Sequence, residues 1–342
     1  MSTTSYRVVV LGLHHDHVWS HLQDVRRSSH AELVGVADPH LPLLSQARQR
    51  FQCATYADYD ELLETVEADI AYIFANNRVS AFLAVMAAKR GLHVMIEKPL
   101  GADLEGAEEA HRVTKEQGVR LMVNWPFAWS PPLLKAMAMI DAGDIGHVWQ
   151  VKYRAAHAGP REMGCSEYFC DWLFNERLNG GGALIDYACY GCVLARTILG
   201  MPTGVQARSG NDIKVDLRVD DNAVVLMNYP RASALAEASW IQQGDLTSYQ
   251  SIFYGEKGTL IADTIEDGTL TLADSTNPKG KAILDLEIPR HQRHATAHLT
   301  WALDNDMPLM PLVSADVGRD AQAILSAAKS AASMPGTPVK QF

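Results

Sequence analysis

The first 125 residues alternate between short, nearly continuous apolar runs and stretches with helical spacing of apolar residues. Continuous apolar runs are typical of strands in a sheet that is covered on both faces, because neither face then needs polar side chains. We predict strands over 7–11, 33–37, 70–74, 93–96 and 120–123. Helical spacing predicts helices over 80–90 and 104–117, and Gly118 stands where a helix cap is expected.

Strands that alternate with helices form right-handed βαβ units, and these units build a parallel, doubly wound sheet. We therefore predict an α/β protein whose first domain covers residues 1–124. From about Val151 the pattern changes to alternating runs over 219–227, 251–261 and 269–273, separated by Gly, Asn and Asp turns. An apolar helix over 182–199 precedes these runs, and a helix over 314–332 follows them. We predict a second, α+β domain over 125–342 with a large, mainly antiparallel open sheet, and the final helix is a candidate to pack back on the first domain.

Composition narrows the class of protein. The 342 residues include 30 Lys and Arg against 40 Asp and Glu, a formal net charge of −10, which argues against binding to nucleic acid. No apolar run approaches the roughly 20 residues that span a bilayer, so we expect no membrane partner. The chain begins almost directly with a predicted strand, which leaves no room for a signal peptide, and its five cysteines are sparse. We expect a cytoplasmic protein.

The turn after the first strand carries part of a dinucleotide-binding pattern. In that pattern a glycine makes the turn, the pyrophosphate lies at the helix N-terminus, and an acid about 20 residues later binds the ribose. Gly12 and Asp38 fit the two ends, whereas His14 and His17 stand where the second and third glycines belong. The sequence therefore predicts a Rossmann-type dinucleotide domain with an unusual turn.

The histidines of this turn have three interpretations. Their imidazole N–H groups could reach the phosphates or the substrate. A second interpretation is a metal site from His14, His15, Asp16 and His17. In the third, the residues only begin the helix, with Asp16 as its N-cap. A cluster within one turn does not easily wrap a tetrahedral ion, and no distant Cys or His partner is evident, so we predict no metal centre.

Asp38 also bears on the choice of cofactor. A carboxylate accepts hydrogen bonds from ribose hydroxyls and repels a 2′-phosphate, which favours NAD over NADP; the alternative is a simple turn acid followed by Pro39. Asn76 and Asn77 are either turn formers or part of the ligand crevice at the carboxyl ends of the strands. The residues expected to bind the cofactor are Gly12, Leu13, His14, His15, His17, Asp38, Asn76, Asn77, Glu97, Lys98 and Asn124.

Two further motifs place charged or polar residues next to apolar elements, which indicates candidate catalytic residues. Glu97-Lys98-Pro99 follows the strand at 93–96, and its lysine is expected to face the cofactor crevice. The run Gly-Gly-Gly-Ala-Leu-Ile-Asp at 180–186 opens the apolar helix. On one continuous helix, Asp186 and Tyr190 lie four residues apart on the same face, where polar groups are costly unless they are paired or used.

Together these motifs resemble the glucose–fructose oxidoreductase / inositol dehydrogenase (Gfo/Idh/MocA) family of NAD(P)-dependent enzymes. The similarity rests on Glu97-Lys98-Pro99, on the glycine run at 180–186, and on Val-Asp-Asp-Asn-Ala-Val-Val at 219–225 with Gly-Glu-Lys-Gly-Thr at 255–259. It spans essentially the whole chain.

The resemblance implies specific roles. In the family the lysine of Glu-Lys-Pro is central to catalysis and an Asp-x-x-x-His pair completes the site; here Lys98 and Asp186 are retained, and Tyr190 replaces the histidine. That tyrosine is similar to a subgroup that includes glucose–fructose oxidoreductase and the dimeric dihydrodiol dehydrogenases. The glycine-poor turn is a second departure, and it bears on the usual pyrophosphate geometry.

The chemistry of alcohol oxidation agrees with these roles. The hydroxyl must lose a proton as hydride leaves its carbon, and a free tyrosine, with a pKa near 10, is a poor base at neutral pH. An adjacent Lys98 ammonium would lower the pKa of Tyr190, so we expect these two residues to share the acid/base role while Asp186 orients the substrate. The residues expected to contact substrate are Lys98, Trp125, His157, Trp172, Asp186 and Tyr190.

We therefore expect an NAD-dependent oxidoreductase that acts on a secondary alcohol or ketone of a sugar, cyclitol or related polyol. By analogy with related proteins we expect a homo-oligomer, a dimer or a tetramer. Two alternatives stay open. One is an NAD-dependent glycosidase that oxidises, eliminates and re-reduces; the other is a non-catalytic nucleotide-binding sensor, which the missing glycines make plausible.

Overall fold

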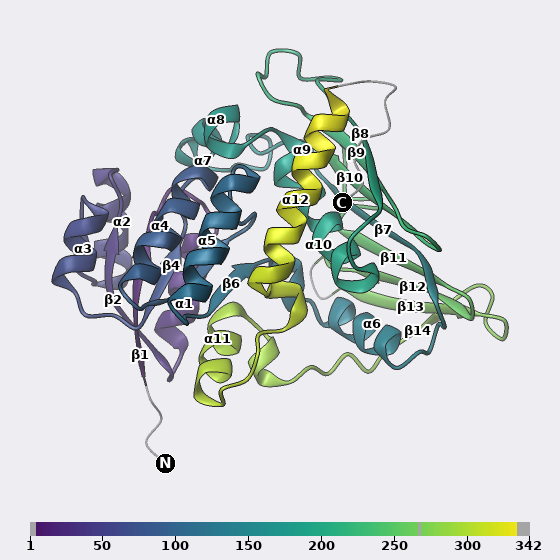
Figure 1. Ribbon diagram of the computed structural model, residues 1–342, viewed down its shortest axis with the longest axis horizontal. Coiled ribbons are helices and arrows are strands. Elements are labelled where there is room, and N and C mark those ends of the chain that lie inside the picture. Colours follow the sequence, from purple (N-terminus) through teal and green to yellow (C-terminus); the bar gives the residue numbers. More distant parts are fainter. Residues whose placement is uncertain (1–4, 266–267, 334–342) are drawn as a thin grey trace. The chain divides into compact units, whose positions relative to one another are not determined.

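The computed structural model of the chain describes residues 5–265 and 268–333 (Figure 1). It separates into two compact units. The first contains Met1–Asn124, Cys165–Gly180 and Arg290–Arg319, and the second contains Trp125–Gly164, Gly181–Pro289 and Asp320–Phe342. The chain passes from the first unit to the second after Asn124, and two later segments group with the first unit.

The first unit is built on a six-stranded, wholly parallel sheet, as the apolar runs predicted. Its strand order is β3-β2-β1-β4-β5-β6, which is doubly wound about β1 and β4. Both faces are buried, so Val8, Val9 and Val10 are at most 1% exposed. The strands are β1 (Tyr6–Leu11), β2 (Ala31–Ala37), β3 (Thr55–Tyr56), β4 (Ile70–Ile73), β5 (His93–Glu97) and β6 (Leu121–Asn124).

Helices α4 and α5 lie side by side in the first unit (Figure 1). Capping fixes where each begins, because the side chain of Asn76 accepts from Val79 N and that of Asp103 accepts from Gly106 N. The first cap explains why α4 starts before the predicted Ser80. The helices are α1 (Val18–Arg27), α2 (Leu41–Phe51), α3 (Tyr59–Thr65), α4 (Asn77–Lys89), α5 (Leu104–Glu116), α7 (Glu167–Leu173), α8 (Glu176–Asn179), α11 (Ala295–Asp304) and the short 3₁₀ turns η2 (Arg290–Gln292) and η3 (Pro311–Val313).

The second unit is built on an eight-stranded sheet of order β14-β13-β12-β11-β7-β10-β9-β8. Strands β7 and β10 pair in parallel and every other neighbouring pair is antiparallel, which confirms the mainly antiparallel sheet. The run at 251–261 is two strands joined by a turn at Glu256 and Lys257. The strands are β7 (Val148–Ala156), β8 (Gly204–Gly210), β9 (Asn222–Asn228), β10 (Ser233–Ser239), β11 (Gln250–Gly255), β12 (Gly258–Asp263), β13 (Thr269–Asp274) and β14 (Lys281–Ala282).

One face of this sheet is covered by helix α10, which packs on β7 and β10. Gly191 of α10 has no room for a side chain, because an added Cβ would lie 2.4 Å from the Cβ of Ala236. The predicted helix over 182–199 is broken at Tyr187 into α9 and α10. The helices are η1 (Pro126–Trp129), α6 (Pro131–Asp141), α9 (Ala183–Asp186), α10 (Ala188–Leu199) and α12 (Ala315–Ala332), whose first residues belong to the first unit.

The other face of the same sheet is partly exposed. A row of paired residues crosses it from Ile252 on β11 through Lys152 on β7 and Leu235 on β10 to Leu226 on β9. The one charged member of this row, Lys152, forms an ion pair with Glu237 at 2.8 Å. The other three members, Ile252, Leu235 and Leu226, are apolar. Among the helices of the described residues, none alone is long and apolar enough to cross a membrane; one bent pair, 176–186 with 188–199, passes that length and composition test together.

Candidate active site

The turn after β1 is held close to the end of β4 by Gly12. Its φ of +93° is a conformation that residues with a side chain rarely adopt, and an added Cβ would lie 2.5 Å from the backbone nitrogen of Ala75. The Gly12 backbone N–H donates to the Ala37 carbonyl at 2.8 Å, which ties the turn to the end of β2 as well. The glycine that the sequence identified is therefore required by the backbone itself.

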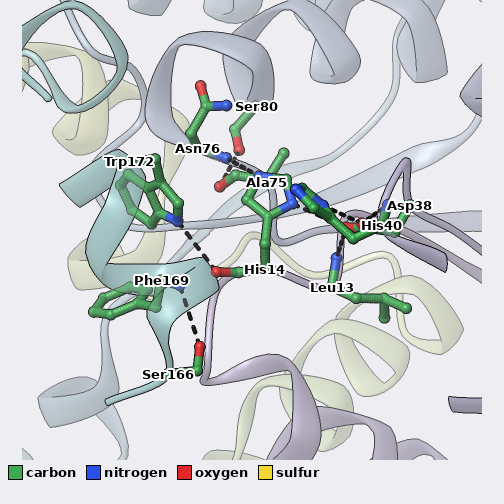
Figure 2. Close-up of polar contacts among 10 residues, drawn as sticks. All are labelled: Leu13, His14, Asp38, His40, Ala75, Asn76, Ser80, Ser166, Phe169 and Trp172. Atoms are coloured by element: carbon green, nitrogen blue, oxygen red, sulfur yellow. Dashed lines mark hydrogen bonds and ion pairs between the residues drawn. The ribbon is translucent and has the colours of Figure 1, made fainter. Parts of the chain in front are cut away.

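Behind this turn a buried network joins β2, the turn and α4 through His14 (Figure 2). The His14 Nδ1–H donates to Asp38 Oδ2 at 2.9 Å, and His14 Nε2 accepts from the backbone N–H of Asn76 at 2.9 Å. Because Nε2 accepts from an N–H group, the proton of a neutral His14 lies on Nδ1. The side chain that replaces the second glycine thus joins the ends of three elements.

Asp38 is fully buried, and both of its oxygens are occupied by protein donors. Oδ2 accepts from Leu13 N at 2.6 Å and from His14, while Oδ1 accepts from the backbone N and the ring Nδ1 of His40, each at 2.7 Å. Burial alone would raise the pKa of Asp38, but the hydrogen bonds from His14 and from the N–H groups of His40 and Leu13 outweigh it, so the pKa is lowered. The carboxylate is ionised and internally satisfied.

These contacts bear on how a dinucleotide fits. The parallel sheet, the Gly12 turn and the acid at the end of β2 fit such a cofactor. The backbone N–H groups that usually face the pyrophosphate are partly engaged, since Leu13 N donates to Asp38 and His15 N donates to the Phe74 carbonyl at 3.1 Å. In this turn the phosphates would therefore rely more on side-chain donors than on backbone N–H groups.

The interpretation of Asp16 as a helix cap is wrong. Helix α1 begins at Val18 with His17 in the cap position and no side-chain capping bond. The Asp16 carboxylate instead accepts from the backbone N–H and the hydroxyl of Ser166, at 2.7 and 2.6 Å. Trp172, expected to contact substrate, donates its indole N–H to the His14 carbonyl at 3.1 Å (Figure 2). Both contacts fasten the segment around α7 to the turn.

The two asparagines after β4 have different partners. Asn76 caps α4 and supplies the N–H that His14 accepts. The Asn77 side-chain amide donates to the side-chain oxygen of Asn179 at 2.7 Å and to the Asn179 carbonyl at 3.1 Å. Asn77 therefore also anchors the end of α8, and the cofactor role of both residues stays a prediction.

At the carboxyl end of β5, Glu97 is surrounded by imidazoles. Its Oε1 lies 3.2 Å from His17 Nδ1, and its Oε2 accepts from the Asn124 side-chain amide at 2.7 Å. That amide also lies 3.1 Å from Nε2 of His21. Burial would raise the pKa of Glu97. Its imidazole neighbours His17, His15 and His21 lower that pKa by more than burial raises it, so the net shift is downward. Burial also lowers the pKa of His15 well below its usual value.

Lys98 follows Glu97 directly and is 3% exposed, with its backbone N–H donating to the Asn124 carbonyl at 3.3 Å. It belongs to the first unit, whereas Asp186 and Tyr190 belong to the second. Their joint action stays a prediction.

In the second unit, the glycine run and the Val-Asp-Asp motif meet at the start of α9. Asp220 accepts from the backbone N–H groups of Gly182 and Leu184, at 2.9 and 2.7 Å. Gly182 cannot carry a side chain, because an added Cβ would lie 2.0 Å from the Asp220 carbonyl oxygen. Burial raises the pKa of Asp220, and these backbone N–H groups oppose that rise. Asp220 therefore fixes the short helix that ends in Asp186.

Asp186 and Tyr190 do not share one continuous helix face, contrary to the sequence argument, because the chain departs from helical geometry at Tyr187. Tyr190 instead lies in an aromatic cluster. Its ring centroid is 5.1 Å from that of Phe127 and 5.8 Å from those of Trp125 and Tyr153. Trp125 is fully buried.

A cavity of about 440 Å³ opens beside this cluster within the second unit. Among the described residues that line it, none is charged at neutral pH. The buried hydroxyl of Tyr153 has no hydrogen-bond partner among the described residues, and burial raises the pKa of Tyr153 well above its usual value. The lining residues are Pro126, Phe127, Trp129, Ser130, Pro131, Tyr153, Tyr190, Tyr249, Thr264 and Ile265.

Several of these residues were not among those that the sequence analysis proposed. Phe127 and Tyr153 come from η1 and β7, Tyr249 lies in the turn just before β11, and no local pattern links them. The alternation of the strand places Tyr153 on the same buried face as Val151 and Ala155, and this was the one sequence feature that could have identified Tyr153 as a lining residue. His157, expected to contact substrate, accepts from Gly159 N through its Nδ1 at 2.8 Å and packs edge-on against Tyr187.

Comparison with known proteins agrees with this architecture. Residues 6–125 match a family model described as an oxidoreductase family with an NAD-binding Rossmann fold, and residues 133–261 match the GFO/IDH/MocA C-terminal domain.

Three relatives illustrate the range of similar proteins. A dTDP-3,4-didehydro-2,6-dideoxy-alpha-D-glucose 3-reductase of Streptomyces violaceoruber is 31% identical over 51% of this chain and 48% of its own length. The D-xylose 1-dehydrogenase (NADP(+)) 2 of Haloferax volcanii is 30% identical over 73% of this chain and 80% of its own length. The myo-inositol 2-dehydrogenase of Thermotoga maritima is 23% identical over 90% and 91%. The chain spans about half the length of several of the relatives it matches.

Solved structures share the fold. Levoglucosan dehydrogenase in complex with NADH and levoglucosan superposes with a TM-score of 0.83 and 19% identity, covering 99% of this chain and all of the other.

Proposed function

Because the chain belongs to the Gfo/Idh/MocA family of NAD(P)-dependent oxidoreductases, we propose that it transfers hydride between NAD and a secondary alcohol or ketone of a sugar, cyclitol or related polyol. The names of its relatives, which include a nucleotide-sugar reductase, a xylose dehydrogenase and an inositol dehydrogenase, support this substrate class. The observation that carries the proposal is the position of Lys98 directly after β5, at the edge of a parallel sheet where ligands bind in this architecture.

When bound, NAD supplies the nicotinamide carbon that takes up or gives hydride. We propose that Gly12, Leu13 and the partly exposed His17 hold the phosphate side, and that Asp38 lies toward the ribose. Glu97, Lys98 and Asn124 then lie toward the nicotinamide. The buried and ionised Asp38 supports NAD over NADP, since a 2′-phosphate near the end of β2 would be repelled by a carboxylate that cannot easily become neutral.

We assign the proton transfer to Lys98 and Tyr190. In the oxidative direction the substrate hydroxyl gives its proton to the Tyr190 oxygen, and the Lys98 ammonium stabilises the phenolate form that accepts it. Asp186 accepts a hydrogen bond from a substrate hydroxyl and thereby orients it. The aromatic cavity beside Tyr190, whose described lining residues are all uncharged, suits the apolar C–H face of a ring whose hydroxyls point outward.

We further propose that the chain forms a dimer or tetramer through the open face of its eight-stranded sheet. The half-exposed row Ile252, Leu235 and Leu226 supports this, because an apolar row across several strands is better covered than left in water.

The test is a screen of the purified chain with NAD and NADP against a panel of sugars and cyclitols, read by NADH absorbance. We expect net NADH formation with at least one neutral polyol, and a preference for NAD. Lys98→Met should lower kcat by about 100-fold or more while leaving the Kd for NAD, measured by tryptophan fluorescence, within about threefold.

The exposed Lys89→Met variant is the matched control and should keep full activity. Sugar turnover that gives no net NADH would indicate the glycosidase-type cycle. NAD binding without turnover on the whole panel would favour a nucleotide-binding sensor.

A further inference from the structure

Three potential metal ligands converge at the carboxyl edge of the first unit's sheet. His15 and His17 belong to the turn after β1, and Glu97 ends β5. One ligand atom from each lies within 4.8 Å of the other two. Two ligands of one tetrahedral Zn²⁺ lie about 3.4 Å apart, and the His17 Nδ1 to Glu97 Oε1 distance of 3.2 Å is already close to that value.

His15 is the member whose surroundings within the protein leave it poorly satisfied. Its side chain is 1% exposed, and its Nε2 has no hydrogen-bond partner among the described residues. Its Nδ1 receives only a long contact, 3.3 Å, from the His17 backbone N–H. Leaving a polar ring buried in this way is unfavourable, and coordination to a cation would offset that cost.

The carboxylate of Glu97 is held in position from its far side. The Asn124 amide donates to Oε2 at 2.7 Å, so the other oxygen is directed toward His17. Such an outer contact is what orients metal-binding carboxylates in known sites. His17 is two-fifths exposed, which leaves a route for an ion to enter and a position for water.

We propose that, in the chain without a dinucleotide, His15, His17 and Glu97 bind a divalent transition-metal ion of the Zn²⁺ class, with the remaining position open to water. Two of these side chains, His17 and Glu97, are proposed above to face the dinucleotide, so the ion and the cofactor would compete for them. Two imidazoles and one carboxylate suit such ions, whereas Mg²⁺ and Ca²⁺ prefer oxygen ligands alone. No distant partner for the histidines of this turn was evident from the sequence. The fold supplies it, since Glu97 stands 80 residues beyond His17 in the chain.

A second cluster, His14, Asp38 and His40, offers a matched comparison. Its ligand atoms also lie within 4.8 Å of one another, but His14 uses both ring nitrogens and Asp38 uses both oxygens in hydrogen bonds to the protein. An ion there would have to displace several of these bonds. The two clusters therefore differ in one respect: the first contains a ligand with poorly satisfied hydrogen-bonding capacity, whereas the ligands of the second are already hydrogen-bonded to the protein.

The experiment is a titration of the untagged, metal-stripped full chain with Zn²⁺ by calorimetry, repeated with Co²⁺, whose visible absorption bands report coordination by nitrogen and oxygen in a low-coordinate site. We expect one ion per chain. His17→Gln should weaken binding by more than about tenfold and lose the Co²⁺ bands, and Glu97→Gln should do the same. His40→Gln should bind like the parent.

His17 is partly exposed, so His17→Gln should fold, and circular dichroism checks this. His15 is buried, so His15→Gln disturbs the fold more and serves only as a second test. Binding lost in His40→Gln and kept in His17→Gln would overturn the proposal, as would no stoichiometric binding to the parent. Neither cofactor nor substrate enters the measurement, so its outcome does not depend on the redox function proposed above.

Discussion

Replacing Asp38 by Asn tests the buried network that joins β2, the turn after β1 and α4. The amide keeps the shape of the carboxylate but turns one oxygen into an NH₂ group. Whichever way it faces, two N–H donors lose their acceptor: Leu13 N and His14 Nδ1 on one side, or the two nitrogens of His40 on the other. A buried donor without a partner costs about 1–3 kcal/mol. A ring flip of the partly exposed His40 relieves one of them, so one donor stays unpaired and we expect a loss of about 1–3 kcal/mol in the free energy of unfolding.

The loss should depend on pH in a defined direction. The folded state lowers the pKa of Asp38 below the unfolded value of about 3.9. A carboxyl with a lowered folded pKa contributes stability that is fully present above its unfolded pKa and is lost as pH falls toward the folded pKa. The difference between the parent and Asp38→Asn should therefore be constant near neutral pH and should shrink below about pH 4.

The assay is urea unfolding at 25 °C followed by tryptophan fluorescence, at pH 7 and at two values below 4. Asp60→Asn is the control, since Asp60 is an exposed acid whose ion pair with Arg90 should contribute less than about 1 kcal/mol. If Asp38→Asn is as stable as Asp60→Asn at pH 7, the argument that its four donors need an anionic acceptor is refuted.

Three further predictions concern the second unit. Asp220→Ala should lower its stability by about 1–2 kcal/mol by freeing the N–H groups at the start of α9, measured as a fall in Tm. Gly191→Ala should cost about 1–3 kcal/mol, because the new Cβ meets Ala236, and adding Ala236→Gly should recover part of the loss in a double-mutant cycle; no recovery would contradict the packing argument. Leu235→Lys should convert the proposed oligomer into monomers in light scattering after size exclusion, whereas Leu246→Lys, on an exposed loop residue, should not; an unchanged mass for Leu235→Lys would place the interface elsewhere.

Much of the fold follows from the sequence because it depends on periodicity. Strands buried on both faces must be almost wholly apolar, which is why the strands at 6–11 and 93–97 stand out. The pair of residues in β3 is too short to give such a pattern. The break at Tyr187 was missed because apolar residues continue on both sides of it, so only packing decides where the chain bends. The turn at Glu256 and Lys257 was also missed, although glycines flank this polar pair.

The site was less predictable, because its chemistry depends on contacts between distant residues. The sequence identified Gly12 and Asp38 but could not show that His14 and His40 occupy the carboxylate. Asp16 has the residue type of a helix cap, yet its partner is Ser166, 150 residues away. His17 and Glu97 form a pair only because β1 and β5 end at the same edge of the sheet.

The first unit is discontinuous, and this has a consequence for its biosynthesis. The hydroxyl of Tyr72 on β4 donates to Thr296 Oγ1 at 3.0 Å, and Met122 on β6 forms an isolated bridge with Ser314. Thr296 and Ser314 are synthesised about 172 and 190 residues after Asn124, a delay of roughly 9–38 s at about 5–20 residues per second. During that interval the nascent sheet lacks its last segment, so a chaperone that shields this surface should raise the yield of native protein during translation.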